Sequence, residues 1–375
     1  MKTKLRSLLK AQPVLLIAGA VALLTMLAVP PDAGYLGYCN PTVLIQLFAL
    51  MAAVAGLRSA GLFEAVTGML LRRAGTVRRL AAVFVLLSFI SAMFVTNDVA
   101  LLTLVPLTLL TYTVLHDERS RILTIVLETA AANLGSMLTP IGNPQNIYLY
   151  DTYQLTFGAF LGTMLPLGLV SLVLLLAGTL LLPDTACPAP DTQSAPMRRL
   201  PTFGFTVLFG ICLLTVLRLV PDWCCLAAAL LITLLIDRRV LARVDYALLL
   251  TFVCFFVFVG NIGRIDAVRT FFSGVLQGHE LIVSVLLSQV ISNVPAAVML
   301  SGFTQEGTAL LIGVNLGGLG TLIASLASLI SFQLYRRAEG ARPGRYLLAF
   351  TLVSIALLVP LLAVTFLVQG GRAYA

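Results

Sequence analysis

Two triplets, Thr-Asn-Asp at 96–98 and Ser-Asn-Val at 292–294, bring polar residues into long apolar stretches of this chain. Downstream of each, the sequence Asn-Leu-Gly recurs at 133–135 and at 315–317, a separation of 182 residues (315 − 133). The same separation relates Thr139 to Thr321, Asn143 to Ser325 and Asn146 to Ser328. A membrane chain built as two copies, with polar breaks at equivalent places, is typical of secondary transporters.

The composition places the chain in a membrane. It is 59% hydrophobic and 11% charged, with a mean hydropathy of +1.01, whereas a soluble domain is about 25% charged. We therefore predict an all-α, polytopic membrane protein with two inverted-topology repeats, about nine membrane spans of roughly 20 residues and two re-entrant hairpins. The predicted spans are 13–30, 41–57, 121–150 (broken), 155–182, 202–220, 222–236, 245–262, 307–332 and 346–368.

The charge distribution orients the protein. The chain carries 24 Lys and Arg and a net charge of +8. If both hairpins are re-entrant and the N-terminus is cytoplasmic, all of these residues lie on the cytoplasmic side except Arg218, Arg264, Arg269 and Arg372. This is a strong positive-inside bias, and a hairpin that crossed fully would remove much of it. The basic charge therefore predicts a multi-pass protein of the cell inner membrane with a cytoplasmic N-terminus, and it requires no nucleic-acid partner.

The predicted organisation has four parts. They are an N-terminal span at 1–40, a first repeat at 41–182 containing the hairpin 79–115, a connecting loop with two spans at 183–244, and a second repeat at 245–370 containing the hairpin 280–303. The first repeat starts outside and the second inside, so inversion relates them. The short segments 59–78 and 264–278 contain arginine and predict helices that lie in the membrane interface. Proline after the first apolar run favours an uncleaved span over a signal peptide.

The chemistry-bearing residues do not predict an enzyme. The six cysteines show no Cys-x-x-Cys spacing and only two histidines are present, so we expect neither a zinc site nor a disulfide framework. His116 and His279 fall near the predicted membrane surfaces, and the chain has no His-Glu-x-x-His string. We expect no catalytic residue and no cofactor beyond a coupling ion. A channel could use the same hairpins, but inverted repeats with interfacial arms favour alternating access.

Each hairpin tip would expose the first N–H groups of a half-helix near the middle of the membrane, where they can hold an anion. Side-chain oxygens at both tips could bind a small cation, namely those of Thr96, Asn97, Ser292 and Asn293. For Na⁺ we predict the ligands Asn97, Asp98 and Asn293. These residues could instead be helix caps in a static fold. Two symmetric hairpins favour a binding site.

The string Thr-Pro-Ile-Gly-Asn-Pro-Gln-Asn at 139–146 predicts a broken helix. Pro140 and Pro144 each remove a backbone donor, and Gly142 frees φ. Three amides then fall in the middle of a span, and a simple proline kink would not need them: Asn143, Gln145 and Asn146. The second copy has Thr321, Ser325 and Ser328 in a stretch rich in glycine and small residues, where we expect a milder break.

Asp98 and Glu128 are the ionisable residues that this topology buries deepest. A carboxylate in mid-membrane costs several kcal/mol and usually marks an ion or proton pathway. Asp98 also lies where a helix N-cap would be, so capping is a competing role. The counterparts Val294 and Leu310 are apolar, which suits a coupling ion bound in the first copy or a titrating Asp98. Glu128 could simply face a polar cleft.

The predicted substrate and ion site therefore gathers residues of both copies. They are Thr96, Asn97, Asp98, Asn133, Gly142, Asn143, Pro144, Gln145, Asn146, Ser292, Asn293, Val294, Asn315, Thr321 and Ser325.

These strings resemble the ion transporter superfamily of citrate and dicarboxylate permeases, which includes divalent anion:sodium symporters and arsenite permeases. The resemblance covers nearly the whole chain and is closest to bacterial citrate-transporter-like anion permeases. It rests on TNDVALLTLVP at 96–106, NLGSMLTPIGNPQN at 133–146, SQVISNVPAAVML at 288–300 and Asn-Leu-Gly at 315–317. It implies two re-entrant hairpins, a site between their tips, a homodimer and elevator-type movement of the inner part.

The tips depart from one branch of that superfamily. The sodium-dicarboxylate branch carries Ser-Asn-Thr at both tips, and the threonines that would contact a substrate carboxylate are missing at 98 and 294. An Asn-Asp tip resembles the arsenite-permease and sodium/proton-antiporter branches, where an acid would serve coupling.

The resulting hypothesis is a secondary active transporter that moves a small anion, either di- or tricarboxylate-like or an inorganic oxyanion, with Na⁺ or H⁺ coupling. The alternatives are an arsenite efflux permease or a Na⁺/H⁺ antiporter, and then an ion channel. The expected partners are the small-molecule anion, membrane lipids and a second copy of the chain. The sequence leaves the solute, the coupling ion and the direction of transport open.

Overall fold

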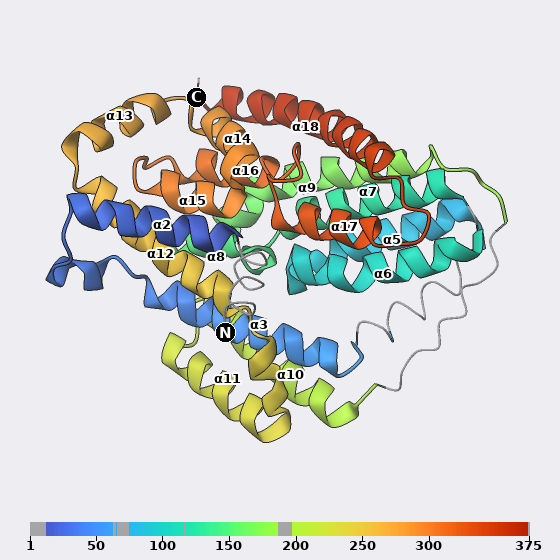
Figure 1. The fold of residues 1–375 in the computed structure, drawn as a ribbon, viewed down its shortest axis with the longest axis horizontal. Helices are drawn as coiled ribbons and strands as arrows, with labels where there is room; N and C mark the ends of the chain where they lie inside the picture. Colours follow the sequence, from blue (N-terminus) through green and yellow to red (C-terminus); the bar gives the residue numbers. More distant parts are fainter. Residues whose placement is uncertain (1–12, 63–64, 66–74, 116, 187–196, 374–375) are drawn as a thin grey trace, which may run out of the picture.

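The computed structural model describes the chain except residues 1–12, 63–64, 66–74, 116, 187–196 and 374–375. Within the described residues the fold is built from α-helices and 3-10 turns, with no β-strand (Figure 1). This confirms the predicted all-α class. The elements are α2 (Pro13–Ala28), η1 (Ala33–Gly37), α3 (Pro41–Ser59), α5 (Val77–Val95), α6 (Asn97–Leu115), α7 (Glu118–Ser136), η2 (Pro140–Gly142), α8 (Pro144–Thr152), α9 (Phe157–Thr179), α10 (Arg199–Val216), α11 (Asp222–Ile236), η3 (Arg238–Arg243), α12 (Tyr246–Gly263), α13 (Asp266–Leu276), α14 (Glu280–Ile291), α15 (Asn293–Ser301), α16 (Gly307–Leu316), α17 (Leu326–Arg336) and α18 (Pro343–Ala373).

Six helices of the described chain are long and apolar enough to cross a membrane: α3, α5, α9, α10, α12 and α18. The pair α13 and α14, bent by 111°, would add a seventh span if counted as one. Two of the predicted spans are apolar helices of fewer than 18 residues: α2 has 16, and α11 has 15 with the predicted bounds 222–236. The predicted spans also included 121–150 and 307–332, which are both broken. α5 is long enough to cross alone, although the sequence places it in a hairpin.

The first broken helix is interrupted at the proline-containing string 139–146. α7 ends at Ser136, the turn η2 follows, and α8 begins at Pro144. The second copy is interrupted just as fully, because α16 ends at Leu316 and α17 begins only at Leu326. The expectation of a milder break there was wrong. Gly320 adopts a φ of +116°, a conformation that ends a helix and that residues with side chains rarely adopt.

The helices form two bodies (Figure 1). α3 packs on α10 and α11, and α12 packs on α2 and α3; we call these five helices the scaffold. α5 to α9 and α14 to α18 pack around α7 and α16, and we call them the hairpin body. The two bodies meet where α8 contacts α3 and where α15 contacts α12.

A short helix links the scaffold to the second hairpin. This helix, α13, lies within the predicted interfacial segment 264–278 and is separate from α12 and α14 (Figure 1, top left). It exposes Phe271 and Val275 while it buries Leu276, as an amphipathic helix does. Its position in the membrane interface stays a prediction. Most of the equivalent segment 59–78 lies outside the described residues.

Small residues let the helices of the hairpin body approach closely. A Cβ at Gly135 of α7 would lie 2.1 Å from the carbonyl oxygen of Phe89 on α5. A Cβ at Gly317, the counterpart of Gly135 in the second copy, would lie 2.7 Å from the Cβ of Ser288 on α14. Each copy therefore seats the first arm of its hairpin against a glycine of its broken helix.

Replacing Gly135 with alanine should lower the free energy of unfolding by about 1–3 kcal/mol, because the new methyl group must push α5 away from α7. The measurement is thermal unfolding of the purified protein in detergent. Gly162→Ala on α9 is the control, since nothing lies within 4 Å of a Cβ at that position. If both variants unfold like the parent protein, α5 and α7 are not in rigid contact.

Candidate functional site

The two hairpins turn at equivalent residues with the same unusual backbone. Between α5 and α6, Thr96 has φ 68° and ψ 150°; between α14 and α15, Ser292 has φ 76° and ψ 154°. The two residues are 196 positions apart (292 − 96). Glycine alone adopts this region readily, and other residues cost about 1–3 kcal/mol there. Because both tips carry the same strain, the contacts around them must hold them in shape.

A threonine next to each broken helix fixes the neighbouring tip. Thr139 Oγ1 donates a hydrogen bond to the carbonyl oxygen of Met93 on α5. Thr321 Oγ1 donates to the carbonyl oxygen of Gln289 on α14 at 3.0 Å. Thr139 and Thr321 are equivalent, and Met93 and Gln289 are related by the offset of the tips (289 − 93 = 196). The same tether is built twice, so Thr321 has a structural role at the site.

Asn133 of α7 joins the two copies. Its Oδ1 accepts hydrogen bonds from Asn97 Nδ2 and from Ser325 Oγ, both at 2.9 Å. Its Nδ2 donates to Ser328 Oγ at 3.1 Å. The side chain is buried. The first hairpin tip, the centre of the first broken helix and the start of α17 therefore meet at one amide.

Asn315, the counterpart of Asn133, makes the reciprocal connection. Its Nδ2 donates to Asn146 Oδ1 at 2.8 Å. Asn146 in turn donates to the carbonyl oxygens of Thr139 at 3.1 Å and of Ser136 at 3.2 Å. Since Asn146 and Ser328 are equivalent positions (328 − 146 = 182), each Asn-Leu-Gly asparagine contacts the break of the other copy. This is the arrangement that an approximate two-fold axis between inverted repeats produces.

Three buried amides near these contacts have polar atoms with no hydrogen-bond partner among the described residues. Asn143 donates to Ser136 Oγ at 2.6 Å, but its Oδ1 has no partner. The Oδ1 of Asn315 and both polar atoms of Gln145 have none. Each of these three side chains is at most 2% exposed, and an unpaired buried amide costs about 1–3 kcal/mol. Such atoms are the free acceptors and donors that a polar solute or a small cation would use.

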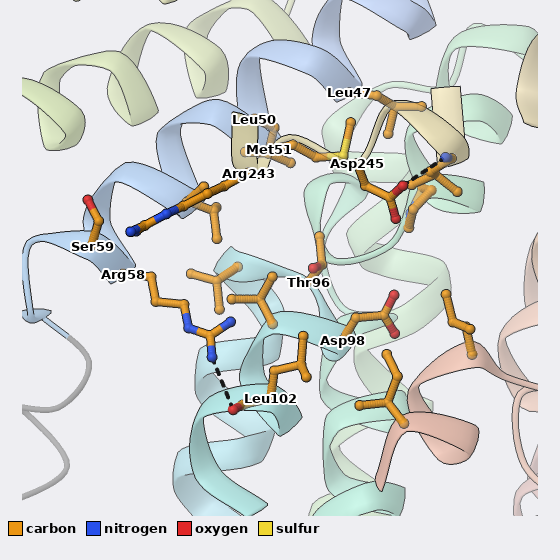
Figure 2. Close-up of a pocket in the computed structure, with 18 residues that line it drawn as sticks. Leu47, Leu50, Met51, Arg58, Ser59, Thr96, Asp98, Leu102, Arg243 and Asp245 are labelled. Atoms are coloured by element: carbon orange, nitrogen blue, oxygen red, sulfur yellow. Dashed lines mark hydrogen bonds between the residues drawn. The ribbon is translucent and has the colours of Figure 1, made fainter. Parts of the chain in front are cut away.

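A cavity of about 650 Å³ lies in front of the first tip (Figure 2). Thr96 and Asp98 line it from the hairpin body, while α3 and the start of α12 form the opposite wall. Most of its lining is apolar: Leu47, Leu50, Met51, Val54, Val95, Val99, Leu102, Leu248, Leu326 and Ile330. The carboxylate of Asp98 faces this cavity and accepts no hydrogen bond from the described residues, so it caps no helix. A carboxylate in such surroundings is typical of an ion or proton pathway.

Three further charged residues line the same cavity: Arg58, Arg243 and Asp245. Figure 2 shows Asp245 opposite Asp98, with its carboxylate capping α12 through a 3.0 Å hydrogen bond from a backbone N–H. Arg58 Nη2 donates to the carbonyl oxygen of Leu102 on α6 at 3.2 Å, so it bridges the scaffold and the hairpin body. The cavity wall therefore carries charge from both bodies.

None of these three residues was predicted for the site. Arg58 follows one apolar run, and Arg243 and Asp245 precede another. Charged residues at such positions ordinarily mark the membrane surface. Only the packing of α3 against η3 and α12 brings them to the first tip, and no spacing in the sequence signals that packing.

The remaining predicted residues separate by role. A Cβ at Gly142 would lie 2.1 Å from the carbonyl oxygen of Ser136, so this glycine allows the chain to turn back on α7. Pro144 lines the cavity, whereas Val294 packs against the apolar core. Asn293 does not line the cavity; its N–H donates to the carbonyl oxygen of Ala324 at 3.0 Å. The cavity thus reaches the first tip and not the second.

Replacing Thr96 with glycine should raise the free energy of unfolding by about 1–2 kcal/mol, because glycine adopts the tip conformation without strain. Thr103→Gly, in the ordinary helical backbone of α6, should lower it by about 0.5–1 kcal/mol. Thermal unfolding of both variants in detergent measures the difference. Equal destabilisation by the two changes would show that the tip backbone is not strained.

Comparison with known proteins gives the same picture of the fold. The chain matches the citrate transporter family, CitMHS, over residues 7–306. It is 34% identical over 296 residues to the inner membrane protein YbiR of Escherichia coli, covering 78% of this chain and 79% of that protein. It is 32% identical over 324 residues to the uncharacterized transporter MJ0456 of Methanocaldococcus jannaschii, covering 85% and 88% of the two chains.

Two more distant proteins are also similar. The silicon efflux transporter LSI3 of Oryza sativa is 32% identical over 188 residues, which cover 48% of this chain and 37% of LSI3. The crystal structure of the YdaH transporter of Alcanivorax borkumensis superposes with a TM-score of 0.62 over 90% of this chain and 88% of that one, at 15% identity, and so shares the fold. By its sequence match and its apolar helices, the chain belongs to the citrate transporter family and is a multi-pass membrane transporter.

Proposed function

We propose that this protein is a secondary active transporter that moves a small anion across the cell inner membrane with H⁺ coupling. The observation that carries the proposal is the cavity between the two bodies. There Asp98 of the hairpin body faces Asp245 of the scaffold, with Arg58 and Arg243 on the same wall. The substrate class is a di- or tricarboxylate or an inorganic oxyanion.

The charges of this cavity couple an anion to a proton. With both carboxylates ionised, two negative and two positive charges cancel. Like charges that face each other in an apolar cavity repel, and a proton on Asp98 removes that repulsion. The protonated cavity carries one net positive charge, which favours an anion. Binding of the proton and binding of the anion therefore help each other.

The unpaired amides supply contacts for the solute. Asn143 and Gln145 lie at the start of α8, one on each side of the cavity-lining Pro144. Backbone N–H groups at the start of a helix carry partial positive charge and suit an anion. The amide oxygens could instead hold Na⁺, which is the other coupling ion consistent with the site.

The contacts between the two bodies support an elevator-type movement. At the start of α3, Asn40 Nδ2 donates to Asp151 Oδ2 of α8 at 2.6 Å. Near it, Arg218 Nη2 donates to the carbonyl oxygen of Tyr150 at 3.1 Å. The cavity lies beside the later part of α3, from Leu47 onward. The bodies thus pack directly at one end of α3, whereas at the other end the cavity lies between them and the Arg58–Leu102 hydrogen bond crosses it.

The charge distribution supports a cytoplasmic position for the cavity end. Arg58 and Arg243 lie there, and basic residues favour the cytoplasmic face. We take this as an inward-facing state. Movement of the hairpin body would break the Asn40–Asp151 contact and carry Asp98 away from Asp245.

The first experiment measures uptake of labelled citrate and succinate into proteoliposomes under separate H⁺ and Na⁺ gradients. Asp98→Asn should reduce H⁺-driven accumulation at least about tenfold, because an amide cannot take up and release the proton. Asp245→Asn should also reduce it, because the repulsion that the proton on Asp98 relieves is then lost. The control is Asp266→Asn at the start of α13, outside the cavity lining. Accumulation that follows the Na⁺ gradient and is unchanged by both cavity variants contradicts H⁺ coupling.

A disulfide between Asn40→Cys and Asp151→Cys, in a chain whose six native cysteines are replaced, should arrest transport until a reductant is added. The crosslink would hold α8 on the scaffold. The matched control is Thr42→Cys with Asp222→Cys, two residues within the scaffold whose side chains are hydrogen-bonded at 2.9 Å. Full transport by the crosslinked Asn40 and Asp151 variant would contradict movement between the two bodies.

A second candidate is efflux of an uncharged oxyacid in exchange for protons. The largely apolar cavity lining and the similarity to a protein named as a silicon efflux transporter favour it. The same proteoliposomes distinguish the two candidates. Proton-driven movement of arsenite or silicic acid, with none of citrate, succinate, phosphate or sulfate, would establish the second.

A further inference from the structure

α7 is the central helix of the hairpin body and has an unusually polar buried face. It packs against α5, α6, α9, α16, α17 and α18, and from Ile122 onward nearly all of its residues are buried. Its buried polar residues recur at helical spacing from one end to the other: Arg121, Thr124, Glu128, Thr129, Asn133 and Ser136. Polar residues on a lipid-bounded bundle are expensive and usually functional. The site at Asn133 uses only the end of this row.

Glu128 is the acidic member of the row and has no counter-charge among the described residues. Its side chain is fully buried. Oε1 accepts a hydrogen bond from Thr108 Oγ1 of α6 at 2.6 Å, and Oε2 has no partner. An ionised carboxylate with a single neutral donor is costly in such surroundings. A protonated carboxyl group is neutral, and its Oε1 can still accept the hydrogen bond from Thr108. The protonated form of Glu128 therefore suits this environment better.

Hydroxyl groups extend from the region of Glu128 toward the basic end of the hairpin body. Thr129 and Ser331 are hydrogen-bonded at 2.6 Å, and Ser331 and the Tyr346 hydroxyl at 3.1 Å. The Tyr346 ring stacks on Tyr335 with centroids 4.8 Å apart. The Tyr335 hydroxyl then donates to the carboxylate of Glu118 at the start of α7. These groups lie between the buried middle of α7 and its surface end, and the step from Tyr346 to Tyr335 is a ring contact, not a hydrogen bond.

The titratable groups around Glu128 come from three elements. Tyr346 of α18 interacts electrostatically with it. Tyr112 of α6 is one helical turn from Thr108 and bonds to Thr124 at 2.8 Å. Arg121 on α7 lies about two turns away, paired with Glu118. α5, α9 and α16 bring no titratable residue within this buried stretch.

We propose that Glu128 is a second proton-binding site of this transporter, which holds a proton in the present conformation and exchanges it with the cytoplasmic end of α7 through Tyr346 and Ser331. The proton leaves the carboxyl group for the hydroxyl path and returns from bulk water at the surface. The role in transport rests on the proposed H⁺ coupling, whereas proton binding by Glu128 does not. Glu128 would add a proton to each cycle beyond the one at the Asp98 cavity.

The direct test is infrared spectroscopy of the purified protein, which detects the C=O stretch of a protonated carboxyl group. At neutral pH the parent protein should show such a band that Glu128→Gln removes. Thr108→Val should move the band to higher frequency, because it removes the hydrogen bond to the carbonyl oxygen. The control Thr111→Val removes a hydroxyl that bonds only to the carbonyl of Leu107 on its own helix, and it should leave the band unchanged. Tyr346→Phe should slow hydrogen–deuterium exchange of this band several-fold.

Absence of a Glu128-dependent band in the parent protein at neutral pH overturns the proposal. A band whose frequency is unchanged in Thr108→Val also overturns it. This second test remains available if Glu128→Gln proves unstable. Unchanged exchange in Tyr346→Phe overturns the path. In proteoliposomes, Glu128→Gln should reduce H⁺-driven citrate accumulation at least about tenfold. If the parent moves citrate with H⁺ and this variant does so equally well, the transport role fails; if the parent shows no H⁺-driven transport, the proposed function fails while the infrared result stands.

Discussion

A chain that leaves the helical conformation inside a membrane must find partners for the polar groups it frees, because the hydrocarbon offers none. In the part of the chain that the structure describes, two hairpin tips and two broken helices do so. The protein meets the requirement by bonding these places to one another. Thr139 and Thr321 tether the tips, while Asn133 and Asn315 reach across to the break of the other copy. The irregular segments are therefore one connected unit, and the surrounding helices enclose it.

That unit determines where chemistry can occur. Polar atoms without hydrogen-bond partners, such as those of Gln145, lie next to groups whose hydrogen bonds are already made. The scaffold contributes charge from one side only, through Arg58, Arg243 and Asp245. The cavity is thus lined by Asp98 from the hairpin body and by these three charged residues from the scaffold.

Much of this could be predicted from the sequence, because periodic signals carry it. The tips at Thr96 and Ser292, the break at Pro140 to Pro144 and the two-copy offset were all identified from residue order. The contacts between the two copies were not predictable in detail. They depend on how the copies pack in space, and a constant offset in the sequence does not determine that packing. The same limit explains why Arg58 and Asp245 were missed: each looks like an ordinary flanking charge until α3 meets α12. The extent of the second break was underestimated. Glycine and small residues occur both inside membrane helices and at helix ends, so they do not by themselves show where a helix stops.

The two helix breaks lie at equivalent positions but differ in their residue composition. The first is framed by Pro140 and Pro144, whose rings fix φ and leave the backbone little freedom. The second contains Gly317, Gly318 and Gly320, which leave it a wide range. The backbone at the first break therefore has less conformational freedom than the backbone at the second. The second break compensates with side-chain contacts, because Gln289 of α14 bonds the backbone at Gly317, Leu319 and Thr321. A rigid ring in one copy is thus matched by a glutamine clamp in the other.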